Sequence, residues 1–307
     1  MDRVNVLVTG GAGYTGIPLT RALLEAGHQV TVLDAFVDAP HALIPLLLQY
    51  PALSVARRDV RELGTEDVAG IDLVYHLAAI SGYPECQADP FTARTVNVDA
   101  TARLAELLGP DQMLVFASTT SFYGASGAAS TEATEPTPVS LYGETKAQAE
   151  RVVMQRPNSV SLRWATVFGA SPRMRMSLMV NDFVLRALED RVITLYDGDS
   201  RRSFIHIEDQ TRGYMDVLER PEAYRDRIVN MGAEVLNLTK REVAQGVAAR
   251  IPCEVLDADV ADRDTRHFFV SYALAEEIGF RCTRDLAYGV AELERTLRMF
   301  LPRSTIL

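Results

Sequence analysis

The sequence has few cysteines, no paired histidines and no long apolar run. Its three cysteines, Cys86, Cys253 and Cys282, lie far apart, which fits neither a disulfide framework nor a zinc cage. The five histidines show no paired spacing, so we expect no metal site. The longest apolar run, residues 42–48, contains Pro45 and is too short to span a bilayer. The sequence therefore predicts a protein with reduced thiols, no metal and no membrane partner.

Acidic residues outnumber basic ones, 41 to 31. The formal net charge is -10 at pH 7, which argues against a nucleic-acid backbone or an anionic membrane as a partner. The first apolar segment begins at Val4 and leaves no room for a signal peptide, so we expect a cytoplasmic protein. A chain of 307 residues can bury a large core and fits one large domain or two interlocked ones.

The most informative stretch lies near the start of the chain. Residues 4–8 are apolar and β-branched, as expected of a parallel strand covered on both faces, and residues 18–26 predict a helix. Between them lie three glycines at three-residue spacing. A strand, a tight glycine turn and a helix N-terminus together form a site for a pyrophosphate, although such glycines can also serve only as a turn. The residues expected to bind the cofactor here are Gly10, Gly13, Tyr14, Thr15 and Gly16.

Acidic residues follow the next two predicted strands. Residues 29–33 end at Asp34, where a carboxylate accepts hydrogen bonds from the adenosine ribose and repels a 2′-phosphate. Asp34 therefore supports the dinucleotide site and favours NAD over NADP. A third strand, residues 53–56, precedes Asp59 and Val60. Asp59 either accepts from the adenine amino group or caps a helix that begins near Val60, and the sequence does not decide.

Strands and helices continue to alternate over the first 120 residues. Residues 71–77 predict a fourth strand, residues 92–108 a long helix and residues 113–117 a fifth strand. The alternation predicts an α/β fold with a doubly wound parallel sheet. At the end of the fourth strand, small residues let the cofactor backbone pass closely. The cofactor contacts expected there are Leu77, Ala78 and Ala79.

Two loops are expected beside the site. The loop at residues 80–89 faces the crevice of a doubly wound sheet and offers Ser81 as a substrate contact. Residues 124–138 are small, polar and proline-containing, which predicts a flexible loop.

The residues that can carry chemistry follow the fifth strand. Tyr142 and Lys146 are four residues apart, so a helix places them on one face. A free tyrosine has a pKa of about 10, and a nearby ammonium and a positive nicotinamide ring both favour its phenolate. The hydroxyl of Thr119 could hold the substrate oxygen. This arrangement suits removal of a proton from an alcohol whose hydride leaves for NAD.

In their order, these motifs resemble the extended short-chain dehydrogenase/reductases, in particular the nucleotide-sugar epimerases and dehydratases. The resemblance rests on residues 9–16, 76–79, 97–98, 118–124, 142–146, 162–169, 202–209 and 230–232. It implies a Rossmann-type NAD-binding domain over residues 1–165, to which residues 203–219 return, and a smaller interlaced substrate domain over residues 166–307. It also implies a homodimer formed through the helices at residues 92–108 and 141–155.

The resemblance also implies roles for single residues. Tyr142 would be the base, Lys146 would hold the nicotinamide ribose and tune Tyr142, and Thr119 would bind the reacting hydroxyl. Asn97 would lie on the cofactor side of the active centre. Contacts to the substrate, a nucleotide-diphosphate sugar, would come from Ser81, Thr119, Thr120, Thr166, Asn181 and Arg202. Arg263 or Arg266 would add a phosphate contact, and the sequence does not choose between them.

The sequence departs from the family pattern at four positions. Thr15 stands where a larger apolar residue is usual, and Thr166 where many 4-epimerases have asparagine. Thr120 and Ser121 stand where 4,6-dehydratases carry an aspartate and a glutamate. Elimination of water needs those carboxylates, so dehydration is disfavoured, and loss of the glutamate also disfavours the nucleotide-sugar decarboxylases.

The sequence therefore predicts an NAD-dependent nucleotide-sugar C4 epimerase that acts through a transient 4-keto sugar. Residues 165–175 and 180–183 also resemble a bacterial group that includes enzymes oxidising C4 of GDP-heptoses, so a nucleotide-sugar 4-dehydrogenase is the alternative. A non-catalytic NAD-binding protein and an NADPH-dependent reductase are less favoured, because the catalytic residues and Asp34 are present. The sequence names neither the sugar nor its nucleotide.

Overall fold

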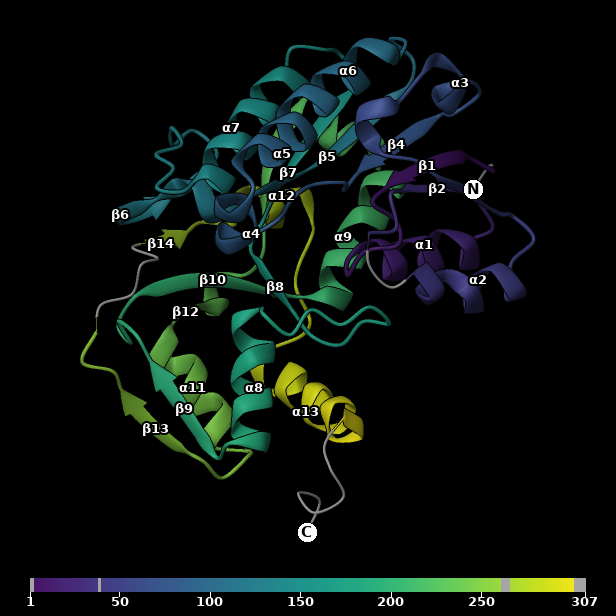
Figure 1. Ribbon diagram of the computed structural model, residues 1–307. Coiled ribbons are helices and arrows are strands. Elements are labelled where there is room, and N and C mark those ends of the chain that lie inside the picture. Colours follow the sequence, from purple (N-terminus) through teal and green to yellow (C-terminus); the bar gives the residue numbers. More distant parts are fainter. Residues whose placement is uncertain (1–2, 38–39, 261–265, 301–307) are drawn as a thin grey trace.

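The computed structural model describes residues 3–37, 40–260 and 266–300 (Figure 1). Its core is a seven-stranded sheet in the order β11-β7-β5-β4-β1-β2-β3, in which every neighbouring pair is parallel. The strands are β1 (Asn5–Thr9), β2 (Gln29–Asp34), β3 (Leu53–Arg57), β4 (Leu73–His76), β5 (Met113–Thr119), β7 (Ser159–Trp164) and β11 (Arg227–Met231). The predicted α/β fold with a parallel sheet is confirmed.

Both faces of this sheet are covered by helices (Figure 1). Side chains of β1 alternate between two cores, so that Val6 and Val8 pack with Leu19 and Leu23, while Leu7 packs on the opposite face. The helices on the face of Val6 are α1 (Gly16–Glu25), α2 (Ile44–Gln49) and α9 (Ile207–Glu219). On the face of Leu7 lie α3 (Thr65–Val68), α5 (Pro90–Arg94), α6 (Ala100–Leu107) and α7 (Leu141–Val153). The sheet is therefore doubly wound, with the strand order reversing at β1, where such sheets bind their ligands.

The helical segment predicted for residues 92–108 is present but not uniform. Between α5 and α6 the chain forms a π-helical turn, Thr95–Asp99, with Asn97 buried at its centre. The apolar spacing predicted the helix, but it did not predict that the backbone hydrogen bonds change from the α-helical to the π-helical pattern at this turn. Such turns are rare and often occur at functional sites.

A second, smaller core lies below the large sheet in Figure 1. It contains a three-stranded sheet of β12 (Asn237–Thr239), β10 (Arg201–His206) and β8 (Thr166–Phe168), and a parallel pair of β13 (Glu254–Asp257) and β9 (Val192–Leu195). Its helices are α8 (Met179–Glu189), α11 (Lys240–Ala248) and α13 (Leu286–Leu297). Phe168, Val184, Phe204 and Val290 are buried among these elements.

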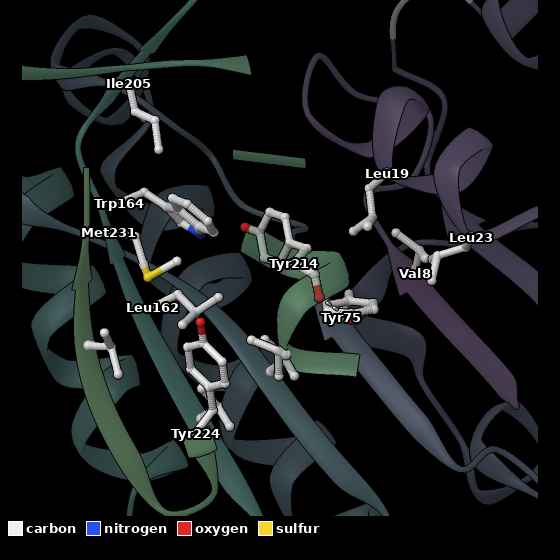
Figure 2. Close-up of a cluster of buried hydrophobic side chains, with 14 of the residues drawn as sticks. Val8, Leu19, Leu23, Tyr75, Leu162, Trp164, Ile205, Tyr214, Tyr224 and Met231 are labelled. Atoms are coloured by element: carbon white, nitrogen blue, oxygen red, sulfur yellow. Dashed lines mark hydrogen bonds between the residues drawn. The ribbon is translucent and has the colours of Figure 1, made fainter. Parts of the chain in front are cut away.

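Part of the chain beyond residue 165 packs with the large sheet. Tyr214 of α9 lies between Trp164 and Tyr75 (Figure 2), with ring centroids 4.7 and 5.4 Å away. The hydroxyl of Tyr75 donates to the carbonyl of Tyr214 at 2.7 Å. Strand β11 also joins the large sheet, although the prediction returned only residues 203–219 to the first domain. The division at residue 165 stays a prediction.

The flexible loop predicted for residues 124–138 is wrong for its first half. Ala125–Ser130 forms β6, which pairs in parallel with β14 (His267–Val270). Its small residues have little strand propensity, and the strand forms because a distant segment supplies backbone partners, which single-sequence reading does not show.

The remaining elements are short. They are the helices α4 (Tyr83–Ala88), α10 (Pro221–Tyr224) and α12 (Ala273–Ile278), and the 3-10 turns η1 (Pro40–Leu43), η2 (Val60–Glu62), η4 (Thr120–Tyr123), η5 (Glu234–Leu236) and η6 (Arg298–Phe300). Within the three described ranges, no helix has the length and apolar character needed to cross a membrane.

Candidate active site

A cavity of 510 Å³ opens where the carboxyl ends of β4 and β5 meet the smaller core. The predicted site residues that line it are Tyr14, Thr15, Leu77, Ala79, Ser81, Thr119, Tyr142, Lys146, Thr166 and Arg202. They come from the glycine turn, from two strand ends, from α7 and from the smaller core. The fold therefore brings together residues that are up to 252 positions apart in the sequence, between Tyr14 and Arg266.

The glycine turn after β1 requires glycine at two positions for different reasons. Gly10 has a φ of 72°, and a Cβ there would lie 2.7 Å from the backbone nitrogen of Ala78. A Cβ on Gly16 would lie 2.4 Å from the carbonyl oxygen of Gly10. These contacts put Ala78 against the turn, as the small residues after β4 predicted. Gly13 donates its N–H to Gly10 at 3.1 Å and closes the turn.

Asp34 ends β2 beside this turn. Its two carboxylate oxygens accept from the backbone N–H groups of Ala12, at 3.0 Å, and Phe36, at 2.8 Å. A carboxylate oxygen has more than one acceptor site, so both remain able to accept from ribose hydroxyls. Asp59 accepts from the N–H of Arg61 at 2.9 Å and caps the turn that begins at Val60. Of the two interpretations of Asp59, the structure contains the cap, and an adenine contact stays a prediction.

Helix α7 positions the predicted base. Ser140 caps it by accepting from the N–H of Gly143 at 3.2 Å, so Tyr142 lies in the first turn and Lys146 one turn later. The ammonium of Lys146 is buried and lies 3.9 Å from the centroid of the Phe116 ring. Burial lowers the pKa of Lys146 to about 7, although the charge of Glu150 opposes this shift.

The phenol of Tyr142 faces Ser81, Thr119 and Arg175. Burial raises its pKa, and the Ser81 hydroxyl, the Arg175 charge and the Thr119 hydroxyl oppose that rise, in this order. The predicted effect of Lys146 on this pKa stays a prediction. Its predicted contact with the nicotinamide ribose is a separate matter and stays a prediction.

Arg175 is a site residue that the sequence did not single out. It lies on the loop between β8 and α8, and its guanidinium donates to the Ser81 hydroxyl at 3.1 Å and to the Ser81 carbonyl. The guanidinium also pairs with Glu85 at 3.3 Å. It therefore joins the loop after β4 to the smaller core across the cavity. In the sequence it is one of two arginines in a short run, with no spacing that distinguishes it.

Asn97 supports the cavity from behind. Its Oδ1 accepts from the N–H of Ile80 at 2.8 Å, and its Nδ2 donates to the Ile80 carbonyl and to the Thr145 hydroxyl, each at 3.0 Å. The π-helical turn thus ties the loop that carries Ser81 to the helix that carries Lys146. Asn97 does not line the cavity, and it bonds the backbone of Ile80 and the hydroxyl of Thr145, which are the neighbours of Ser81 and Lys146 in the chain. Its predicted place on the cofactor side stays a prediction.

Other predicted residues are placed outside the cavity wall. The glycines, Asp34, Asp59, Val60 and Ala78 do not line it, and their contacts with the cofactor stay predictions. Thr120 is fully buried and donates to the carbonyl of Trp164 at 3.2 Å, so that Ser121 lines the cavity instead. The amide of Asn181 is buried, accepts from the N–H of Gly169 at 3.1 Å and donates to the carbonyl of Arg175 at 3.1 Å. It holds the Arg175 loop, and its direct contact with a diphosphate stays a prediction.

Arginine side chains lie at the far end of the cavity. Arg202 is 2% exposed and donates to the carbonyls of Arg201, at 3.0 Å, and Arg266. Arg202 and Arg266 both line the cavity, which suits an anionic ligand in an otherwise acidic protein. Arg263, the other predicted candidate, lies outside the described residues. Within the described ranges, no three His, Cys, Asp or Glu side chains gather as a metal site would require.

Comparisons with known proteins identify the family of this chain. The model of the NAD dependent epimerase/dehydratase family matches residues 6–232. An uncharacterized UDP-glucose epimerase of Bacillus subtilis is 31% identical over 259 residues, which cover 77% of this chain and 79% of that protein.

Two solved structures are similar over nearly the whole chain. A UDP-glucuronic acid 4-epimerase from Bacillus cereus, in complex with UDP-glucuronic acid and NAD, has 26% identity and a TM-score of 0.81, covering 97% of this chain and 100% of that one. An NAD-dependent NDP-hexosamine 5,6-dehydratase of tunicamycin biosynthesis has 26% identity and a TM-score of 0.85, covering 97% and 98%. NAD is the cofactor, and the chain belongs to the NAD dependent epimerase/dehydratase family of enzymes.

Proposed function

We propose that this enzyme inverts C4 of a nucleotide-diphosphate sugar through a transient 4-keto sugar. The observation that carries this proposal is that Thr119, Tyr142 and Lys146 line one cavity while no carboxylate stands at Thr120 or Ser121. NAD, when bound, accepts a hydride from the sugar and can return it. Side chains of the protein would carry out the proton transfer and hold the sugar nucleotide.

The groups around Tyr142 suit proton transfer at the C4 hydroxyl. Thr119 and Ser81 flank the phenol and can hold that hydroxyl in line with it, and Arg175 adds positive charge that favours the phenolate. A positive nicotinamide ring nearby would favour the phenolate further. At the far end, Arg202 and Arg266 would hold the diphosphate, so the sugar could turn and offer the other face of its ketone.

Elimination is less well supported. The cavity wall contains two carboxylates, Glu85 and Asp182, and each has a cationic partner: Glu85 pairs with Arg175 at 3.3 Å and Asp182 with Arg186 at 3.4 Å. Thr120 and Ser121 can neither remove a carbon-bound proton nor protonate a leaving hydroxyl as a carboxyl group would. The dehydratase among the similar structures keeps elimination as an outcome that a test must distinguish.

The test uses nucleotide sugars deuterated at C4, beginning with UDP-glucose and UDP-glucuronic acid. We expect an inverted sugar that retains deuterium at C4, without added oxidant and without net formation of reduced NAD. Nuclear magnetic resonance and mass spectrometry of the product decide this. A reaction with Tyr142→Phe protein controls for background exchange. A free 4-keto sugar with equimolar reduced NAD would instead establish the dehydrogenase, and a product lighter by one water would establish a dehydratase.

NAD is expected to bind more tightly than NADP because of Asp34. A 2′-phosphate beside that carboxylate would be repelled and would lose a hydrogen bond, which costs on the order of 1 to 3 kcal/mol. Calorimetric titration with each cofactor measures the difference, and Asp34→Asn should narrow it. Asp59→Asn, at the N-cap of the turn after β3, should leave the ratio of the two dissociation constants unchanged. Equal constants in the unmodified protein would contradict the assignment of Asp34.

We also propose a homodimer and a cytoplasmic location. Support for the dimer is that the helical run α5 to α6 and helix α7 lie side by side on one face of the sheet (Figure 1), with Phe91 74% exposed on α5. A large exposed aromatic side chain on such a face is suited to burial against a second copy.

A further inference from the structure

One hydrogen bond joins the glycine turn to the C-terminal half of the chain beside the cavity. The hydroxyl of Thr15 donates to Oε1 of Gln210 at 3.0 Å, and both residues line the cavity. Thr15 stands where the family usually has a larger apolar residue, which could not make this bond. The sequence therefore replaces an apolar contact with a polar one at this point.

Gln210 lies in the first turns of α9, which packs against α1 (Figure 1). Its side chain is only 3% exposed. With Oε1 occupied by Thr15, the amide nitrogen Nε2 is the group that remains to face the cavity. Among the described residues no acceptor contacts Nε2, and Nε2 is not among the fully buried atoms without a partner, so its N–H groups are accessible to a ligand in the cavity.

The neighbouring helix end is built for an anion. Thr15 is the N-cap of α1, but its side chain does not cap the helix, because its hydroxyl is bonded to Gln210. At the start of α1 the N–H of Ile17 donates to the carbonyl of Gly13 at 3.2 Å and Pro18 has no N–H, which leaves the N–H groups of Thr15 and Gly16 for a phosphate. The positive end of the helix dipole is also directed to this place. An amide N–H of Gln210 beside them adds a donor to the same place. An anion there also favours the orientation in which Nε2, and not Oε1, faces the cavity.

The cavity also indicates which of the two phosphates of the cofactor lies nearest to Gln210. Gln210 and Thr15 share the cavity with Tyr142 and Lys146, whereas Asp34, which marks the adenosine end, lies outside its wall. The phosphate closest to Gln210 is then the one on the nicotinamide side.

We propose that Gln210 is a cofactor-binding residue whose Nε2 donates to the nicotinamide-side phosphate of NAD, with Thr15 fixing the orientation of the amide. Helix α9 then contributes directly to the cofactor site that the glycine turn of β1 begins. The inference concerns cofactor binding alone and stands whether the enzyme epimerises, oxidises or dehydrates its sugar.

The test compares three nucleotides on protein freed of bound cofactor. Gln210→Met keeps the length of the side chain and removes the amide, and it should weaken NAD and ADP about 10-fold, since a hydrogen bond to a charged group is lost. AMP lacks the second phosphate and should bind within twofold of the unmodified protein. Calorimetry gives the dissociation constants, and the single tryptophan, Trp164, which also lines the cavity, offers a fluorescence readout.

Two further variants separate binding from packing. Thr15→Val leaves the Gln210 amide in place without its anchor, so it should weaken NAD less, and its effect should not add fully to that of Gln210→Met. Thr211→Val, the next residue on α9, lies outside the cavity wall and should leave NAD affinity unchanged. Weaker NAD with unchanged ADP would place the acceptor elsewhere on the cofactor and overturn the proposal. Equal weakening of AMP, or no weakening of NAD, would overturn it as well.

Discussion

Replacing Tyr142 with phenylalanine is expected to reduce turnover at least about 100-fold while NAD binding is retained. The substitution deletes only the hydroxyl, and the ring keeps its place at the start of α7. The phenol faces the hydroxyls of Ser81 and Thr119 in the cavity, which is where a sugar hydroxyl must lose its proton.

The size of the effect follows from the lack of a substitute base nearby. Glu85 and Asp182 line the same cavity but are paired with arginines, and burial, opposed by Arg186, raises the pKa of Asp182. Lys146 has a pKa lowered to about 7 by burial, so part of it is neutral near neutral pH, but its amine lies against the Phe116 ring. If Lys146 acted as the base in the variant, the remaining rate would follow the pKa of the lysine and not that of the tyrosine, so its pH dependence would differ from that of the unmodified enzyme.

The measurement is single-turnover oxidation of the sugar, followed together with the dissociation constant of NAD. Tyr83→Phe is the matched control, because Tyr83 also lines the cavity but has no proposed role in the reaction. It should keep turnover within a few-fold. Near-normal turnover by Tyr142→Phe on the true substrate would show that Tyr142 is not the base.

The sequence was sufficient where a function depends on neighbours in the chain. Gly10 and Gly16 were identified because a tight turn between a strand and a helix needs residues without side chains. In the structure, a Cβ at either position would clash with neighbouring backbone atoms. Tyr142 and Lys146 were identified because helical spacing alone puts them on one face. The parallel sheet followed from the alternation of apolar strands and amphipathic helices, which is also a local pattern.

The sequence was insufficient where contacts join distant segments. Arg175 reaches Ser81, 94 positions away, and Gln210 reaches Thr15, 195 positions away, and neither has a local pattern that marks it. The pairing of β6 with β14 has the same cause. Asn181 is a different case, because its role at the diphosphate was transferred from the family pattern and stays a prediction. In this fold its amide contacts backbone groups of the Arg175 loop.

A buried ion pair beneath α7 gives the largest expected effect on stability. Arg163 on β7 and Glu150 on α7 have side chains that are each 4% exposed, and their closest atoms, Nη2 and Oε1, are 2.7 Å apart. Ser161 donates to the second oxygen of Glu150 at 2.6 Å, and the other guanidinium nitrogen donates to Tyr123 at 2.7 Å. The polar atoms of the pair are therefore satisfied inside the core, and they fix the helix that carries Tyr142 to the sheet.

Arg163→Met is expected to lower the free energy of unfolding by about 3 to 5 kcal/mol, because it leaves the Glu150 carboxylate buried without its cation. Urea denaturation followed by circular dichroism measures this loss. The double variant Arg163→Met with Glu150→Leu removes both charges and should recover much of the stability, which shows that the cost comes from the unpaired charge and not from lost volume. Arg186→Met, which breaks exposed pairs on α8, is the control and should have a much smaller effect, since solvent screens such pairs. A loss for Arg163→Met no larger than that of the control would mean that the pair does not hold α7 to the sheet.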